Sequence, residues 1–309
     1  MERWIVGVDE NGFGPRLGPL TATAASISID DYDPERLAAI ARAHGVDDSK
    51  ANSRFGAMKV AESIALALAA RETGSVPGSA DAFFDALALG GTEALRVPCP
   101  SAHVGRQCFD EPLPLPAFGG DAREGERVLL AVEREGGLRV ERVRTTLACA
   151  AVLNREREAG VSKTRVDLGL FERLLRDARA ASGRDLVAIC GMIGGIRDVP
   201  AYTREFSAED FDPIVLERDV RAYDLRGVGR VRFETSADAN HMPVALASMV
   251  GKYARELGNH RIVGFYRARK PELPMASGYH DPVTTRFIEG AAAIREGEGI
   301  PEACFLRGA

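Results

Sequence analysis

An apolar run at residues 4–8 ends directly on two acidic residues, Asp9 and Glu10. Branched and aromatic side chains in such a short run are typical of a buried β-strand. Two adjacent carboxylates at the end of a buried strand are costly unless a counter-charge neutralises them. A divalent cation bound through oxygen ligands supplies that charge, so the pair predicts a metal site at one edge of a sheet. The simpler alternative is a solvated acidic turn after the strand.

A glycine-rich loop follows the acidic pair. Gly12 and Gly14 flank Phe13, and glycines in such a loop let backbone amides approach a ligand closely. Beyond the loop, residues 20–29 alternate small or apolar side chains with Thr and Ser, which is typical of a second strand. The two runs and the turn between them predict a β-hairpin that opens the fold.

The remaining chain alternates predicted helices and strands. Helices are predicted where apolar residues recur at helical spacing, at residues 56–71, 163–181, 243–257 and 283–295. Strands are predicted for shorter apolar runs, at residues 128–132, 138–146 and 186–189, with further strand or edge segments at 214–216 and 231–233. Residues 73–126 are rich in Gly, Pro and small side chains and predict an irregular insertion with one short helix near residues 81–89. This order of elements favours a mixed α/β sheet covered by helices.

Chain length and hydrophobicity fit one globular domain. The 309 residues, 45% of them hydrophobic, are enough to bury a substantial core. We predict a single domain over residues 1–309, with the irregular insertion at about 73–126. The first residues lack the pattern of a signal peptide, and no apolar stretch approaches the roughly 20 residues that span a bilayer. We therefore expect a cytoplasmic monomer with no membrane contact.

Cysteine spacing and net charge argue against several classes of protein. The five cysteines are Cys99, Cys108, Cys149, Cys190 and Cys304. Their number is odd, they are scattered, and none pairs in Cys-x-x-Cys spacing, which argues against a disulfide framework and against a zinc site. The net charge of −5 and the pI of about 5.7 are unlike a protein that coats nucleic acid through a basic face. Any nucleic-acid contact must therefore be a local groove.

Four short motifs, in order along the chain, resemble those of the ribonuclease HII family. The first is the Asp9-Glu10 pair with its Gly-x-Gly loop, followed by Pro15 and Gly18-Pro19. The others are Asp48-Ser49-Lys50 ahead of a helix, Asp238 ahead of a helix containing Ala247-Ser248-Met249-Val250-Gly251-Lys252, and Ser277-Gly278-Tyr279 before the last helix. Four ordered matches over most of the chain are not expected by chance.

The resemblance implies a ribonuclease H-like α/β fold, with a mixed five-stranded sheet flanked by helices. It also implies a metal-dependent endoribonuclease that cleaves the RNA strand of RNA-DNA hybrids, or ribonucleotides embedded in duplex DNA. Asp9, Glu10 and Asp238 match family carboxylates that bind Mg²⁺ or Mn²⁺ and carry the catalysis. In such a site two cations activate a water molecule and stabilise the leaving 3′ oxygen.

The resemblance further implies which residues bind the substrate. Gly12, Phe13 and Gly14 occupy the loop that, together with Tyr279, reads the 2′-hydroxyl at an RNA-DNA junction in the family. This hydroxyl is the group that separates RNA from DNA chemically. Lys50 matches a phosphate contact. Without the resemblance, Tyr279 is equally well explained as a loop aromatic packed beside Pro282, and Lys50 as a solvated side chain.

Two positions depart from the family pattern. The family has Arg between the loop glycines, whereas this chain has Phe13, so a phosphate contact is lost and stacking is the alternative. The family's third carboxylate ends the strand after the long helix, where this chain reads Cys190-Gly191 with no acid. Asp198, seven residues after Gly191, is a candidate replacement. Loss of a charged ligand should weaken metal binding by more than the about 10- to 100-fold that follows loss of an outer hydrogen bond.

Two functions therefore stay open at the level of sequence. The first is the nuclease itself, which Asp9, Glu10, Asp238 and Tyr279 favour. The second is a catalytically impaired relative that binds hybrid nucleic acid or a protein partner, which the missing acid favours. A phosphate-cradling enzyme acting on small molecules is disfavoured, because the loop lacks Gly-x-Gly-x-x-Gly spacing and adjacent acids repel an anion.

Overall fold

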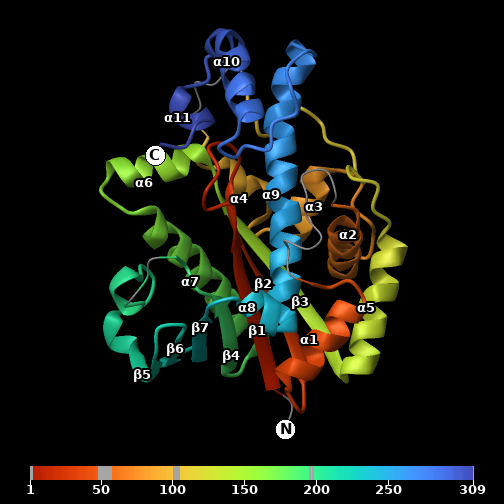
Figure 1. Cartoon of the computed structure of the whole chain (residues 1–309), viewed down its shortest axis with the longest axis vertical. Coiled ribbons are helices and arrows are strands. Elements are labelled where there is room, and N and C mark those ends of the chain that lie inside the picture. The colour runs from red at the N-terminus through yellow and green to blue at the C-terminus, as the bar shows by residue number, and fades with distance from the viewer. Residues whose placement is uncertain (1–2, 48–57, 100–104, 195, 197, 309) are drawn as a thin grey trace.

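The computed structural model describes residues 3–47, 58–99, 105–194, 196 and 198–308. Within them, a mixed seven-stranded sheet in the order β3-β2-β1-β4-β7-β6-β5 forms the centre of the molecule (Figure 1). The strands are β1 (Arg3–Asn11), β2 (Leu20–Ile29), β3 (Leu138–Ala148), β4 (Leu186–Gly191), β5 (Phe211–Leu216), β6 (Val220–Leu225) and β7 (Gly229–Glu234). β1, β2 and β3 are antiparallel neighbours, and β1, β4 and β7 run parallel.

The sheet has two more strands than the five that the resemblance implies. β5 and β6 form an antiparallel hairpin that extends the sheet beyond β7. Pro213 lies within β5, which fits an edge strand because proline cannot donate a ladder hydrogen bond. The predicted segments 214–216 and 231–233 lie in β5 and β7, so both are confirmed as strands. The mixed α/β class is also confirmed.

Helices cover both faces of this sheet, each over its own apolar core. On one face the 28-residue helix α9 (Met242–Arg269) crosses β1 and β2, with α2 (Lys59–Thr73) and α5 (Ala122–Gly136) beyond it (Figure 1). On the other face α7 (Lys163–Ser182) packs against β1 and β2. The remaining helices are α1 (Pro34–Ala43), α3 (Ala80–Leu87), α4 (Gly91–Arg96), α6 (Ala150–Glu158), α8 (Ala237–Asn240), α10 (Pro282–Gly297) and α11 (Glu302–Phe305). Among the described residues, no helix combines the length and the apolarity that a bilayer span needs.

Side chains along β1 alternate between these two faces, as they do in any strand. Val8 belongs to the core beneath α7. A Cβ atom on Gly7 would lie 2.2 Å from the carbonyl carbon of Pro243, so the first turn of α9 lies directly against the strand at this glycine. The same alternation directs Asp9 toward α9 and Glu10 toward α7.

The predicted strand at residues 128–132 is wrong, because these residues lie inside helix α5. The run is short and apolar throughout, and such runs do not separate strand from helix by periodicity. Asp121 caps the helix, accepting from the amide of Arg123, and Gly137 ends it in the left-handed conformation with φ of 63°. The Gly136-Gly137 pair is therefore a helix end and not a hairpin turn.

The predicted short helix near residues 81–89 is confirmed as α3, and α4 follows it. The Pro-rich stretch beyond is fixed to α2 by Glu62, which is fully buried. The carboxylate of Glu62 accepts hydrogen bonds from the backbone amides of Ala117, Phe118 and Gly120 at 2.6 to 2.8 Å. A single buried acid thus satisfies three amides of an irregular loop.

Candidate metal centre at the carboxyl ends of the central strands

The acidic residues predicted for the site lie where the parallel strands β1, β4 and β7 end. Val8 pairs with Cys190 on β4, which in turn pairs with Phe233 on β7. Asp9 and Glu10 follow immediately on β1, so they stand at the carboxyl end of three parallel strands. In open α/β sheets this edge is where ligands bind.

On the α9 side of the sheet, Asp9 meets Asp238. Asp238 lies in α8, which precedes α9 directly, and its Oδ1 accepts from the amide of Ala239 at 3.1 Å. Burial raises the pKa of Asp9 well above its usual value. The charges of Asp238 and Glu10 raise it further, while the Ser248 hydroxyl on α9 opposes the shift. The structure therefore brings together the predicted residues Asp9, Glu10 and Asp238.

On the α7 side, Glu10 meets an acid that the sequence analysis did not single out, Asp167. Asp167 is fully buried, and neither of its oxygens has a hydrogen-bond partner among the described residues. Burial raises the pKa of Asp167 well above its usual value, and the charges of Glu10 and Asp9 add to the rise. Lys163, one helical turn earlier, opposes it. A fourth carboxylate thus belongs to the same cluster.

A signal for Asp167 exists in the sequence. It stands three, four and seven residues before Leu170, Phe171 and Leu174, which form the buried face of α7. Helical residues at these spacings share a face. An acid on the apolar face of an amphipathic helix is rarely left buried without a partner, and this exception marks a candidate functional residue.

Glu10 itself is only partly compensated. Its Oε2 is buried without a hydrogen-bond partner among the described residues. Burial raises the pKa of Glu10, while the backbone amide of Phe13 and the charges of Arg307 and Lys163 oppose the rise. Buried carboxylates with unused oxygens are the donor set that hard divalent cations prefer. Among the described residues, however, no three His, Cys, Asp or Glu side chains are arranged so that they could hold a metal ion.

The position of the missing family carboxylate is closed to a side chain as the site stands. A Cβ atom on Gly191 would lie 2.5 Å from Oδ1 of Asp9. Cys190 is fully buried in the core under α7. The candidate replacement Asp198 is exposed, and its charge contributes, after burial, to raising the pKa of Tyr223 on β6. Asp198 therefore does not join the carboxylate cluster.

The acid that ends β7, Glu234, is engaged elsewhere. Its carboxylate accepts from Nε of Arg232 at 2.7 Å and from Nδ2 of Asn240 at 3.1 Å. Burial alone would raise the pKa of Glu234, but the Asn240 hydrogen bond and the charges of His241 and Arg232 outweigh it and lower the pKa. Glu234 thus carries its own counter-charges.

An arginine near the carboxyl end of the chain lies beneath the glycine loop. Arg307 donates from Nε to the carbonyl of Gly18 at 2.8 Å and from Nη1 to the carbonyl of Gly12, while its Nη2 has no partner among the described residues. Burial, with the nearby charge of Arg255, lowers the pKa of Arg307 to about 9. Arg307 is therefore a buried cation between the loop and the acidic cluster.

The aromatic residues predicted to read the substrate each lie against a cation. Lys163 stands 4.3 Å from the ring centre of Phe13, and the guanidinium of Arg255 stands 4.7 Å from that of Tyr279. Arg255 is almost fully buried and donates to the Ser277 carbonyl at 2.8 Å. Arg255 also lies against the loop, since a Cβ atom on Gly12 would stand 3.2 Å from its side chain. Tyr279, on the other side of Arg255, is 44% exposed. Lys50 lies outside the described residues.

Comparison with solved structures gives the fold. Bst-RNase HIII in complex with Mn²⁺ matches over 99% of this chain and 66% of its own length, with a TM-score of 0.50 and 18% identity. RNase HII in its PCNA complex from Archaeoglobus fulgidus matches 97% of this chain and 92% of its own, with a TM-score of 0.47 and 17% identity. Ribonuclease H2 from Pyrococcus horikoshii matches 98% and 92%, with a TM-score of 0.43 and 17% identity. No protein-family model and no curated protein sequence matches.

The match to Bst-RNase HIII spans the whole sheet and its helices, although this chain covers less than two thirds of that protein. At 18% identity such a match establishes the arrangement of elements and not the chemistry. The chain has a ribonuclease H-like fold of the type found in Bst-RNase HIII.

Proposed function

We propose that this chain is a metal-dependent endonuclease that cleaves the RNA strand of RNA-DNA hybrids, or ribonucleotides embedded in duplex DNA. One observation carries the proposal: carboxylates from β1, α7 and α8 gather at the carboxyl end of the central strands, and two of them have buried oxygens without a partner in the described part of the chain. Buried like charges need an opposite charge, which a divalent cation provides.

Four side chains would hold the cation, two from each side of the strand ends. Asp9 and Asp238 offer oxygens from the α9 side, and Glu10 and Asp167 from the α7 side. Asp167 then takes the place of the family's strand-end carboxylate. Mg²⁺ or Mn²⁺ at such a site supplies a nucleophilic water and neutralises charge on the leaving oxygen. The manganese complex of Bst-RNase HIII, which shares the fold, supports the choice of metal.

The glycine loop and Tyr279 would hold the substrate strand. Gly14 is exposed at the tip of the loop, and Tyr279 presents an exposed ring beside Arg255. Phe13, under Lys163, offers an aromatic face and a positive charge in place of the family's arginine. Aromatic faces stack on bases, and the cations neutralise phosphates. Cleavage would leave 5′ phosphate and 3′ hydroxyl ends.

A second candidate is an impaired relative that binds hybrid nucleic acid or a protein partner without cutting. The absence of an acid at Cys190-Gly191 favours it, because Asp167 on α7 must then stand in for a carboxylate at the end of β4. Both candidates use the same face of the molecule. They differ in whether a bound cation leads to cleavage.

The test is cleavage of a labelled DNA duplex that carries one or several ribonucleotides, with Mg²⁺ or with Mn²⁺. The native chain should cut at the ribonucleotides, and Asp9→Asn should reduce the rate by at least about 100-fold, as loss of a charged ligand exceeds the effect of losing an outer hydrogen bond. Asp177→Asn is the matched control, since Asp177 lies on α7 but pairs with Arg142. It should cut like the native chain.

The two candidates separate clearly in this experiment. No cutting by the native chain in either metal, together with retained binding of the hybrid, would reject the nuclease and favour the impaired relative. Cutting that survives Asp9→Asn unchanged would show that a contaminating nuclease, or a different site, is responsible.

A further inference from the structure

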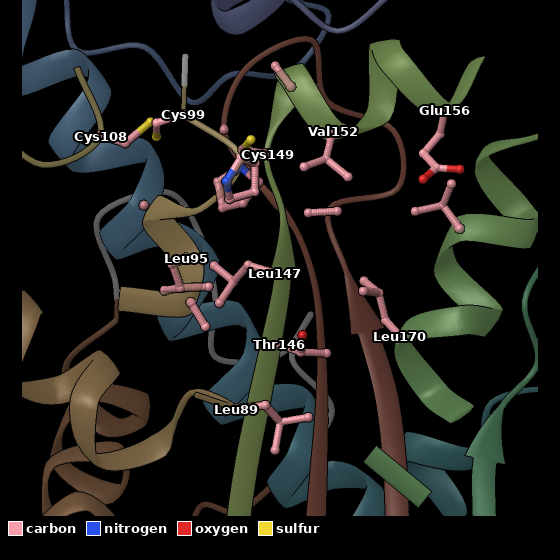
Figure 2. Close-up of a pocket in the computed structure, with 18 of the residues that line it drawn as sticks. Leu89, Leu95, Cys99, Cys108, Thr146, Leu147, Cys149, Val152, Glu156 and Leu170 are labelled. Atoms are coloured by element: carbon pink, nitrogen blue, oxygen red, sulfur yellow. The ribbon is translucent and has the colours of Figure 1, made fainter. Parts of the chain in front are cut away.

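Four of the five cysteines line one small cavity, which contains none of the residues of the acidic cluster. They come from four separate segments: Cys99 follows α4, Cys108 lies in the loop beyond, Cys149 follows β3 and caps α6, and Cys304 lies in α11. The cavity has a volume of about 30 Å³ and shares residues with a larger one of about 460 Å³. Figure 2 shows Cys99 and Cys108 together, with Cys149 nearby at the end of β3. The spacing argument against a zinc site therefore misses a cluster that only the fold assembles.

The thiols are close enough to affect one another's ionisation. Burial raises the pKa of Cys108 well above its usual value, and Cys149, Cys99 and Cys304 add to the rise. Burial, together with Cys149 and Cys99, raises the pKa of Cys304 to about 11. Without a bound cation the Cys108 and Cys304 thiols are protonated at neutral pH. None of the cysteines forms a disulfide.

We propose that Cys99, Cys108, Cys149 and Cys304 bind one Zn²⁺ ion as a structural four-thiolate site. Four sulfur ligands around one point are the usual set for structural zinc, and thiolates favour zinc over the hard cations of the carboxylate cluster.

Binding would require the cysteine side chains to rearrange. The thiols do not yet converge at ligand distances. Each sulfur, however, moves by rotation about a single bond, between staggered positions. Binding also displaces the thiol protons, so zinc affinity should rise with pH.

The backbone around the cluster is already held in place. Gln107 donates to the Cys304 carbonyl at 2.8 Å and accepts from the hydroxyl of Tyr266 at 2.8 Å. Asn154, in α6 just beyond Cys149, donates to the Ala303 carbonyl at 2.8 Å. Fixed backbones reduce the entropy lost when the ligands bind a metal.

A zinc ion here would secure the carboxyl-terminal segment. Cys304 lies three residues before Arg307, whose guanidinium binds the carbonyls of Gly12 and Gly18. The ion would therefore tie the end of β3 and the α4 loop to the segment that supports the glycine loop. The zinc proposal does not depend on the nuclease proposal, since it involves other residues and another class of metal.

The first measurement is the zinc content of the full chain, purified and dialysed under reducing conditions. We expect one zinc per chain, and replacement by Co²⁺ should give the absorption of tetrahedral thiolate coordination. Cys149→Ser and Cys304→Ser should each weaken zinc binding by more than about 100-fold. Losing a ligand costs more affinity than losing a hydrogen bond to a ligand, which costs about 10- to 100-fold. Cys190→Ser is the matched control, because Cys190 lies in the core under α7, outside the cluster. It should keep one zinc.

The cobalt spectrum of the native chain keeps the test valid even if a variant fails to fold. A native chain that takes up no zinc and shows no cobalt-thiolate absorption after full reduction would overturn the proposal. So would a Cys99–Cys108 disulfide, found by mass spectrometry, in a chain that binds no zinc once reduced. Equal zinc loss from Cys190→Ser and Cys149→Ser would also overturn it.

Discussion

Asp167 on α7 turns a fully buried carboxylate toward Glu10 at the end of β1, and the charge of Glu10 adds to burial in raising the pKa of Asp167. Neither oxygen of Asp167 has a partner in the described part of the chain. A buried acid of this kind is unfavourable for folding and persists where function requires it. The pair therefore defines the half of the candidate site that lies on the α7 side.

Replacing Asp167 with Asn should stabilise the metal-free protein and remove metal binding. Each unit by which a folded-state pKa is raised corresponds to about 1.4 kcal/mol against the charged form. We expect Asp167→Asn to raise the free energy of unfolding by at least about 1 kcal/mol at neutral pH, measured by urea unfolding without divalent metal. Manganese binding, followed by the EPR signal of free Mn²⁺, should be lost.

The same substitution ten residues later on the helix provides the control. Asp177→Asn removes a partly exposed ion pair with Arg142, which contributes about 0 to 1 kcal/mol. It should slightly lower stability and leave manganese binding unchanged. A loss of stability in Asp167→Asn as large as that of a disrupted core would contradict the role assigned to Asp167.

The metal-free protein should lose stability as pH rises above the usual carboxyl pKa and Asp9 and Asp167 become charged. The pKa values of Asp9 and Asp167 are raised in the folded state, so the folded chain binds more protons than the unfolded chain above the usual carboxyl pKa. Their contribution is favourable below that pKa and is lost as pH rises through the raised values. Urea unfolding of the native chain and of Asp167→Asn over this range should give a steeper fall for the native chain. If the stability of the native chain and that of Asp167→Asn changed with pH in the same way, the predicted loss of stability at higher pH would be wrong.

Much of the candidate site can be predicted from the sequence because its residues belong to short sequence motifs. Asp9, Glu10 and Asp238 lie together as their positions in the motifs imply, and Tyr279 lies beside the glycine loop through Arg255. Asp9 and Glu10 lie at the end of a strand, and Asp238 lies just before α9. The sheet and α9 therefore determine where these side chains stand. The hairpin that opens the fold and α7 were predictable for the same reason, since apolar periodicity determines them.

The missed features all depend on contacts between distant segments. Asp167 carries no motif, and its role emerges only when α7 packs against β1. Arg307 reaches Gly12 across almost the whole chain. The cysteine cluster likewise joins four segments that sequence spacing treats as unrelated. Residues 128–132 were assigned to the wrong element because a short apolar run fits both a strand and a buried helix.

Binding of an RNA-DNA hybrid should be weak, confined to one groove and sensitive to salt. Lys163, Arg255 and Arg307 are cations at the site, and Lys163 stands over Phe13. Each phosphate neutralised contributes about 0.9 to the slope of log affinity against log salt concentration on duplex DNA. We expect Lys163→Gln to reduce that slope by about one, measured by fluorescence anisotropy at several salt concentrations. Lys59→Gln, at the exposed start of α2, should leave the slope unchanged.

Adding a methyl group at Gly191 should disturb the metal site, although the residue itself offers no ligand. The new Cβ would meet Oδ1 of Asp9 at 2.5 Å, so either Asp9 or the end of β4 must shift. We expect Gly191→Ala to weaken manganese binding by about tenfold, as small misplacements of a ligand do. Gly194→Ala is the matched control, because a Cβ there meets no atom within 4 Å. If Gly191→Ala bound manganese as tightly as Gly194→Ala, Asp9 could not be a ligand in the position described, and the cation would have to sit nearer Glu10 and Asp167.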